Sequence, residues 1–196
     1  MRIWYQSYVD YENGKTYWDR LRKHLEAVVD PGTTVEIKGI TPHDSYAHAL
    51  VEMRCAREVI CNAVRAEREG YDAFVIGHFQ DAGLYEARSA VGIPVVALGE
   101  ASMLYSCQLG QHSGIVASGA DVLIPGGGIP MLLFSAIRGH TVDGAPVING
   151  IPIVAKMAEM AVKLRRLAGL GVSRVSDYIQ PPIEILEEFL THPKGL

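Results

Sequence analysis

The chain has 196 residues, of which 48% are hydrophobic and 20% are charged, and its 22 acidic and 18 basic side chains give a net charge of −4. This length is sufficient for one medium-sized domain or two small lobes, and the mean hydropathy of +0.12 excludes a long disordered chain. Because Lys and Arg form no block in this weakly acidic chain, we expect neither nucleic acid nor a membrane surface as a partner.

Short runs of strand-forming residues alternate with helical periods along almost the whole chain. The predicted strands or extended segments, in chain order, are residues 3–9, 34–37, 72–77, 93–98, 115–117, 122–124 and 146–148. The predicted helices are residues 16–29, 45–69, 84–90, 100–109, 129–137, 151–167 and 183–190. This alternation predicts an α/β fold, a three-layer sandwich with a parallel sheet between helices and right-handed crossovers.

One interval does not fit this pattern. The predicted strands 115–117 and 122–124 are separated by residues 118–121 only, whereas a crossover between parallel neighbours normally needs a dozen or more residues. Three explanations stay open. One strand is wrongly predicted, the two belong to different parts of the sheet, or a crossover segment is missing near Ser118 and Gly119.

The first candidate site follows the strand at residues 72–77, because ligands of parallel sheets bind at the carboxyl ends of the strands. The sequence there reads Gly-His-Phe-Gln-Asp-Ala-Gly-Leu over residues 77–84. His78 would stand at the strand tip and exchange a proton near neutral pH, and Phe79 and Gln80 are candidate substrate contacts. Asp81 is suited to cap the helix that follows. A structural histidine, bonded to backbone at the strand end, is an equally weighted interpretation.

The second candidate site is the run of Gly126, Gly127 and Gly128 between the predicted strand 122–124 and the next helix. Three glycines leave backbone N–H groups able to converge on an anion. The run is neither GxGxxG nor a Walker loop, so it favours a small carboxylate or a carbonyl oxygen over a nucleotide. A simple tight turn is a nearly equal alternative.

Other candidates are less specific. Gln6 and Ser7 end the first strand in polar side chains and are expected to contact substrate, while Glu100 opens a helix, where an acidic residue also complements the helix dipole. His43 and His48 have a spacing that gives little support for a metal site. The absence of a Gly-x-Ser-x-Gly motif gives little support for a serine hydrolase.

The sequence carries no sign of export, membrane insertion or a disulfide framework. Residues 122–137, the most apolar stretch, are interrupted by prolines and glycines, so we expect no membrane span. The first residues lack the long apolar region of a signal peptide, which favours a cytoplasmic protein. Cys55, Cys61 and Cys107 have neither metal-ligand nor redox spacing, and the first two fit a helix as small buried side chains.

Several segments together resemble the aspartate/glutamate/hydantoin racemase superfamily, most closely its hydantoin-racemase branch. They match the first catalytic segment, the next strand with its Gly-Glu helix start, the second catalytic segment and parts of the C-terminal region. The segments are residues 70–84, 93–101, 119–128, 146–150 and 178–189. The resemblance covers most of the chain from about Tyr71 onward.

The resemblance implies two similar α/β lobes that face a small-ligand cleft, and relatives that are commonly homo-oligomers. Residues 1–97 would form the first lobe together with part of the C-terminal region. Residues 98–150 would form a second lobe, shortened near Ser118 and Gly119, because the chain is shorter than its relatives. Residues 151–196 would be a helix and tail that return to the first lobe.

The resemblance also implies proton transfer next to a carbonyl group without a cofactor or metal, and the family normally uses two cysteines on opposite faces of the substrate. In this chain the first cysteine position is His78, and the second falls at Gly126, or at Gly127 if the loop is shifted by one. Racemisation by two thiols is therefore not expected. Isomerisation, elimination, decarboxylation and addition of water need only one acid/base and stay open.

We therefore expect an enzyme, isomerase-like or a lyase, in which His78 acts on a small carboxylate or cyclic amide. The glycine run would stabilise the oxyanion, since a single acid/base needs such help. Two alternatives are a non-catalytic ligand-binding or accessory protein, and a metal-assisted hydrolase that uses His43, His48 or His78.

Overall fold

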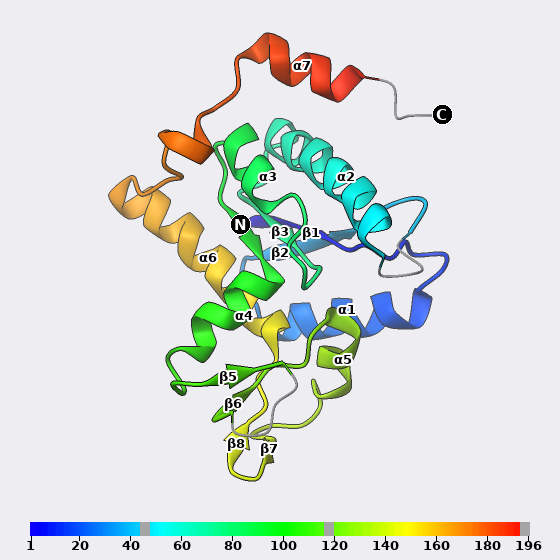
Figure 1. Cartoon of the computed structure of the whole chain (residues 1–196), viewed down its shortest axis with the longest axis vertical. Coiled ribbons are helices and arrows are strands. Elements are labelled where there is room, and N and C mark those ends of the chain that lie inside the picture. Colours follow the sequence, from blue (N-terminus) through cyan, green and yellow to red (C-terminus); the bar gives the residue numbers. More distant parts are fainter. Residues whose placement is uncertain (44–47, 116–119, 193–196) are drawn as a thin grey trace.

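The computed structural model describes residues 1–43, 48–115 and 120–192, and its centre is a four-stranded parallel sheet (Figure 1). The strand order is β2-β1-β3-β4, and neighbouring strands run in the same direction. The carboxyl ends of all four strands therefore lie at one edge of the sheet. The strands are β1 (Arg2–Gln6), β2 (Thr34–Lys38), β3 (Ala73–Ile76) and β4 (Val95–Ala97).

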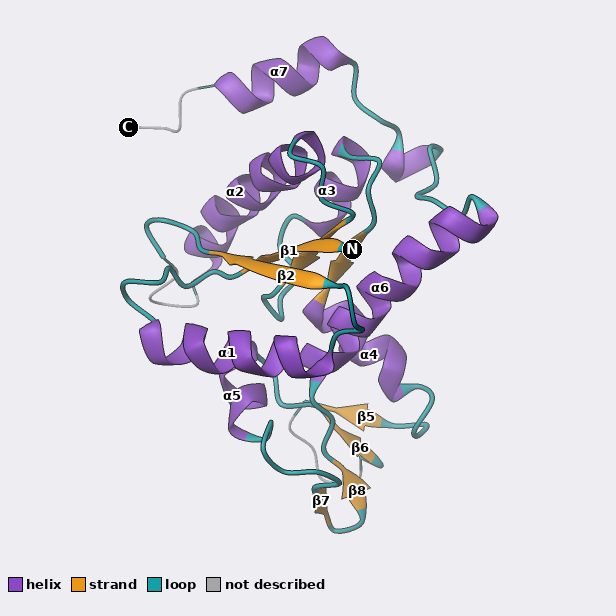
Figure 2. Ribbon diagram, turned by 180° about the vertical axis from the view of Figure 1, so that it is seen from behind, coloured by secondary structure: helices purple, strands orange, loops and turns teal. Residues whose placement is uncertain are grey.

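Helices cover both faces of this sheet, as Figures 1 and 2 show. Alternate residues along each strand point to opposite faces, so Trp4 packs in one core with α2 and α3, and Tyr5 packs in the other with α1 and α6. The predicted α/β fold with a parallel sheet between helical layers is thereby confirmed. The covering helices are α1 (Lys15–Val28), α2 (Ala49–Arg68), α3 (Leu84–Ala90) and α6 (Gly150–Ala168).

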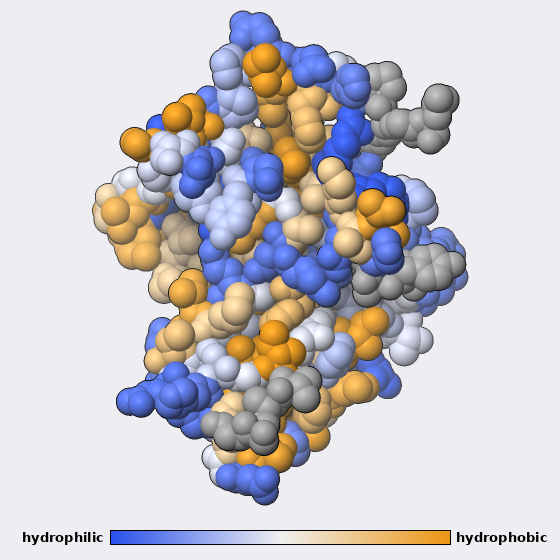
Figure 3. Space-filling view, in the orientation of Figure 1, coloured by the Kyte–Doolittle hydropathy of each residue, from blue (hydrophilic) through white to orange (hydrophobic). Residues whose placement is uncertain are grey.

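The helix α6 is amphipathic, and its inner stripe is buried. Ile151, Val154 and Val162 lie in the core beneath the sheet, while Met160 and Leu167 on the outer side are exposed. Figure 3 shows apolar residues at the surface near the outer end of this helix. The stripe that the sequence placed in residues 151–167 is therefore used for burial within the chain.

A smaller part of the chain lies below the sheet in Figure 1, and the strands in it are all short. Leu123 of this part forms a parallel bridge with Val147, just after β8. The elements are α4 (Leu98–Ser106), β5 (Ser113–Gly114), β6 (Val122–Leu123), α5 (Gly128–Leu133), β7 (Thr141–Val142) and β8 (Ala145–Pro146). The division into two lobes stays a prediction.

The strands β5 and β6 pair in parallel, although only residues 115–121 connect them. The expectation that such neighbours need a dozen connecting residues was wrong here, because each strand has only two residues. The chain needs to travel back only about 7 Å along the strand direction. The strand predicted at residues 115–117 begins two residues earlier, at Ser113; residues 116–119 lie outside the described residues.

Several element ends differ from the prediction for local reasons. The strand predicted at residues 3–9 ends at Gln6, since the Ser7 hydroxyl bonds both the N–H and the carbonyl oxygen of Val9 and turns the chain out of the sheet. Within the described residues, α2 begins at Ala49, because the His48 ring accepts a hydrogen bond from Leu50 N; residues 44–47 are not described. The helix predicted at residues 129–137 ends at Leu133.

The C-terminal tail returns to the outer surface of α2. It contains a short 3₁₀ turn, Ser176–Tyr178, and α7 (Ile183–Thr191), neighbouring α3 and α2 respectively. The Arg57 guanidinium on α2 donates hydrogen bonds to the carbonyl oxygens of Phe189 and His192. No helix in the described ranges combines the length and the apolar character needed to cross a membrane.

Candidate functional site

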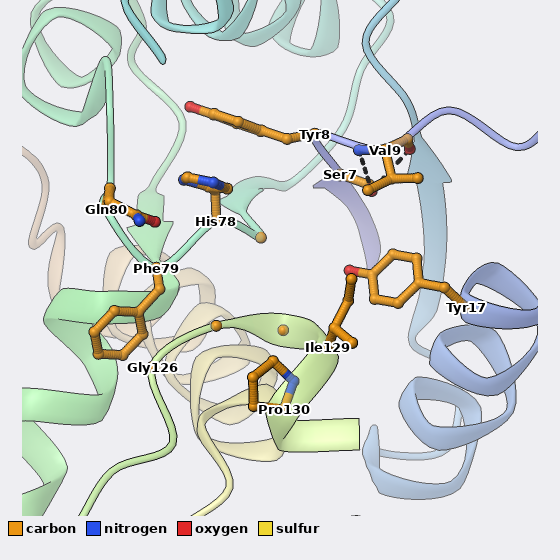
Figure 4. A pocket seen from close by; sticks show the side chains of 13 residues that line it. Ser7, Tyr8, Val9, Tyr17, His78, Phe79, Gln80, Gly126, Ile129 and Pro130 are labelled. Atoms are coloured by element: carbon orange, nitrogen blue, oxygen red, sulfur yellow. Dashed lines mark hydrogen bonds between the residues drawn. The ribbon is translucent and has the colours of Figure 1, made fainter. Parts of the chain in front are cut away.

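A cavity of 460 Å³ opens at the carboxyl edge of the sheet, between the ends of β1 and β3 on one side and the loop before α5 on the other (Figure 4). It lies where ligands bind in parallel α/β folds. Three segments and the start of α1 contribute to it. The lining residues are Ser7, Tyr8, Val9, Tyr17, Gly77, His78, Phe79, Gln80, Gly126, Gly127, Gly128, Ile129 and Pro130.

His78 stands two residues beyond the end of β3 and lines the cavity. Its imidazole lies parallel to the phenol ring of Tyr8, with ring centroids 4.1 Å apart and ring planes 8° apart (Figure 4). The Tyr8 hydroxyl donates a hydrogen bond of 2.9 Å to the carbonyl oxygen of Ala82. This bond fixes Tyr8, and the stacked ring in turn restricts the rotation of the imidazole.

Gly77 is what allows the chain to leave β3 at this position. A Cβ atom on residue 77 would lie 2.2 Å from Cε1 of Tyr5, so only glycine lets the backbone rest on that ring. The Gly77 N–H also donates to the carbonyl oxygen of Gln6 and continues the pairing of β3 with β1. Together these contacts place His78 at the cavity.

The glycine loop, residues 126–128, forms the opposite wall of the cavity with main chain only. Gly127 has a φ of +125°, a conformation that side chains rarely adopt. A Cβ atom on Gly128 would lie 3.1 Å from the Tyr17 hydroxyl oxygen, and one on Gly126 would lie 3.0 Å from Ile115. The structure therefore brings the two sequence motifs, His78 and the glycine run, to one cavity.

Tyr17 is a lining residue that the sequence did not indicate. It lies in the first turn of α1, and its hydroxyl points into the cavity (Figure 4). Burial raises the pKa of the Tyr17 phenol to about 12, although the neighbouring Ser7 hydroxyl acts in the opposite direction. The phenol is thus neutral and able to donate a hydrogen bond. The available signal was topological, because α1 begins at the edge of the sheet where the strands end.

Gln6 was predicted as a substrate contact, and the structure corrects this. Its side chain is buried away from the cavity and is bonded to protein at both ends. The Oε1 atom accepts hydrogen bonds from Trp4 and Asn62, and the Nε2 atom donates to the carbonyl oxygens of Ser7 and Lys38. Gln6 therefore joins β1, β2 and α2 instead of facing a ligand.

Glu100 was also expected at the site, and it does not line the cavity. Its two carboxylate oxygens accept hydrogen bonds from the two terminal nitrogens of Arg88, at 2.9 and 2.5 Å. A partly buried carboxylate that is held by a guanidinium in this way is a structural ion pair. The structure therefore places Glu100 outside this cavity, in an ion pair with Arg88.

Asp81 caps α4, whereas the sequence suggested that it would cap the nearer helix α3. Its carboxylate accepts hydrogen bonds from Gly99 N (2.8 Å) and Glu100 N (2.6 Å), which explains why α4 begins at Leu98. Burial raises the pKa of Asp81 to about 6, while these two N–H donors act to lower it. Asp81 has a φ of 55°, in the left-handed region, and with this backbone conformation its side chain reaches the start of α4.

The histidines of the proposed metal alternative have other contacts. The His43 ring lies 3.4 Å from the Asp10 carboxylate, and His48 caps α2. Within residues 1–43, 48–115 and 120–192, no three His, Cys, Asp or Glu side chains are grouped as metal ligands. Cys55 is buried in α2, as expected, whereas Cys61 of the same helix is only partly buried, and Cys107 is exposed.

The sheet and the cavity at its carboxyl edge define a parallel α/β protein with a small-molecule site at its strand ends. A family model described as Asp/Glu/Hydantoin racemase matches residues 9–126, which include His78 and reach Gly126. The chain therefore belongs to this family, and the resemblance is confirmed.

Two solved structures have the same fold. An allantoin racemase from Klebsiella pneumoniae has a TM-score of 0.73 and 19% identity, covering 92% of this chain and 94% of that one. An allantoin racemase from Pseudomonas fluorescens has a TM-score of 0.64 and 20% identity, covering 100% and 99%. At such identities the likeness shows the fold alone. Comparison with curated proteins gives no match.

Proposed function

We propose that this family member is a cofactor-independent enzyme that moves a proton at a carbon next to a carbonyl group, with His78 as the acid and base. The reaction would be isomerase-like or that of a lyase. The observation that carries this proposal is that His78 and the glycine loop line one cavity from two sides. Removal of a proton next to a carbonyl group needs an acid/base. It is helped by hydrogen-bond donors, such as main-chain N–H groups, that stabilise the charge on the carbonyl oxygen.

The lining favours an uncharged cyclic amide over a carboxylate. Among the described lining residues there is no Lys or Arg to pair with a fixed negative charge. The polar side chains that are present, Ser7, Tyr17 and Gln80 among them, are neutral hydrogen-bonding groups. The structural neighbours are allantoin racemases, and allantoin, like hydantoin, has a ring carbon next to a carbonyl group. We therefore propose a hydantoin-like ring as the substrate.

In the proposed step, a neutral His78 imidazole takes the proton from the ring carbon. The electron pair of the C–H bond forms a C=C bond, and the carbonyl π electrons move onto the carbonyl oxygen. A positioned acid/base gives a rate gain of roughly 10²- to 10⁴-fold. A single imidazole returns the proton to the face from which it took it, so exchange with solvent is the most direct measure of this step.

The test is hydrogen exchange of allantoin and 5-methylhydantoin in deuterium oxide, followed by NMR above the spontaneous rate. We expect His78→Ala to lower the enzymatic rate about 100-fold or more. His112→Ala is the matched control, because the His112 side chain is 76% exposed and does not line the cavity. An unchanged rate in His78→Ala would refute the assigned base. Stabilisation by either compound without exchange would instead indicate a binding protein.

A further inference from the structure

We infer that Tyr17 is the hydrogen-bond donor that holds the reacting carbonyl oxygen. The inference rests on the proposed function, since it assigns the partner of the oxygen next to the carbon on which His78 acts. It concerns a residue of α1, which lies outside both sequence motifs.

The first argument is position. The Tyr17 hydroxyl enters the cavity between the end of β3 and the glycine loop (Figure 4). The point at which Gly128 would carry a Cβ atom lies 3.1 Å from the Tyr17 hydroxyl oxygen and 3.7 Å from the carbonyl oxygen of Gly77. Gly77 immediately precedes His78. The hydroxyl, the glycine loop and the end of β3 that precedes His78 therefore converge on one small region of the cavity.

The second argument is orientation. The Ser7 hydroxyl accepts a hydrogen bond of 3.1 Å from Val9 N and donates one of 2.9 Å to the carbonyl oxygen of Val9. It lies near enough to the Tyr17 phenol to act on its pKa. Figure 4 shows the phenol oxygen turned toward the cavity, where it is placed to donate to a ligand oxygen.

The third argument is protonation. Because burial keeps the pKa of Tyr17 near 12, the phenol holds its proton at neutral pH and acts as a donor, not as a base. Tyr5, beneath Gly77, is also buried, and its pKa is raised well above the usual value by burial and by the nearby Tyr17. Two protonated phenols thus lie under the cavity wall. A neutral donor in a buried site is suited to stabilise negative charge that develops on oxygen.

The proposed step is balanced without a co-reactant. His78 takes the proton from carbon, the electrons move to the carbonyl oxygen, and the Tyr17 O–H shortens its hydrogen bond to that oxygen without losing its proton. When His78 returns a proton to carbon, the electrons return and the hydrogen bond relaxes. Tyr17 therefore contributes mainly in the transition state, where the charge on oxygen is largest.

The experiment compares Tyr17→Phe with Tyr11→Phe in the exchange of allantoin C–H. Tyr11 is the matched control, because its ring is 41% exposed and does not line the cavity. We expect Tyr17→Phe to lower kcat about 100- to 1,000-fold, as the loss of an oxyanion donor does. We expect KM within about threefold and an unchanged pH for half-maximal rate, because a transition-state contact acts on kcat and His78 remains the base. Tyr11→Phe should retain the native rate.

The outcomes separate the two proposals. If Tyr17→Phe exchanges allantoin C–H at the native rate while His78→Ala exchanges it slowly, the role of Tyr17 is overturned and the proposed function stands. A native rate in His78→Ala would overturn the proposed function whatever Tyr17→Phe does. If neither allantoin nor 5-methylhydantoin exchanges with the native protein, both proposals fail.

A second variant applies if Tyr17→Phe does not fold. Gly128→Ala keeps the phenol but places a methyl group 3.1 Å from its oxygen, on the cavity side of the loop. We expect exchange to fall about tenfold or more, in line with a displaced reacting group. Gly171→Ala, where a Cβ atom meets nothing within 4 Å, is the control. A native rate in Gly128→Ala would overturn the inference.

Discussion

The imidazole of His78 lies flat against the phenol ring of Tyr8, with ring centroids 4.1 Å apart. The two rings come from the ends of different strands, β3 and β1, which are neighbours in the sheet. Stacking of this kind sets the plane of the imidazole and leaves its ring nitrogens at the edges. The sheet itself therefore determines the direction from which His78 approaches a ligand.

We predict that Tyr8→Ala lowers the hydrogen exchange of allantoin by about 10- to 100-fold, because a reacting group displaced by about 1 Å loses rate on this scale. Tyr8→Phe keeps the stacked ring and loses the hydrogen bond to Ala82, so its rate should fall by less than that of Tyr8→Ala. NMR exchange rates of the two variants check this. Equal rates in both would show that stacking does not position the base.

Gly77 and Tyr5 are predicted to be coupled in stability. A methyl group on residue 77 would lie 2.2 Å from Cε1 of Tyr5, so Gly77→Ala should destabilise the fold by about 1–3 kcal/mol, as overpacking does. In a Tyr5→Leu background the same change should cost less, since the obstructing ring is gone. Urea unfolding of the four proteins measures this coupling. Purely additive costs would contradict the proposed contact.

The cavity shows which parts of a site a sequence reveals. His78 and the glycine run were found because parallel strands align their carboxyl ends, so motifs at the ends of separate strands meet at one edge. Gln6 and Ser7 are adjacent, yet only Ser7 lines the cavity, because successive side chains of a strand point to opposite faces. The sequence did not indicate which of the two faces would carry the ligand.

The residues missed or misassigned depend on contacts between distant segments. Tyr17 reaches the cavity because α1 packs against α5, and the glycine loop at the start of α5 is more than a hundred residues away in the chain. Glu100 is removed from the site by Arg88, and Asp81 caps α4 through its unusual backbone conformation. Local sequence patterns predict helices, strands and strand ends. The hydrogen-bond and ion-pair partners of these side chains come from distant segments, so only the tertiary structure identifies them.

The junction between α1 and α6 is predicted to weaken in acid. Asp30 accepts hydrogen bonds from Lys156 and Lys163 at 2.6 Å each, which lowers the pKa of its carboxyl to about 2. Because the folded pKa lies below the usual value of 3.8, the stabilisation is complete above about pH 4 and is lost as the pH falls toward 2.

The measurement is the free energy of unfolding of the native protein and of Asp30→Asn between pH 7 and pH 2. The difference between the two should be constant near neutral pH and should shrink steeply as the pH falls from 4 to 2. Added salt should reduce it, because all three side chains are partly exposed. A difference as large at pH 2 as at pH 7 would show that Asp30 acts through something other than its charge.

Ser7→Ala tests whether Ser7 supports Tyr17. The variant removes a hydroxyl that accepts a hydrogen bond from Val9 N and neighbours the Tyr17 phenol, and we expect exchange of allantoin to slow by about 2- to 13-fold, the equivalent of one ordinary hydrogen bond. If Ser7 acts only through the Tyr17 hydroxyl, then adding Ser7→Ala to Tyr17→Phe should not lower the exchange rate further, because that hydroxyl is already absent. The exchange rates of the two single variants and the double variant give the coupling directly. Independent, multiplying losses would mean that Ser7 contacts the substrate itself, and Tyr17 would then need another source for its orientation.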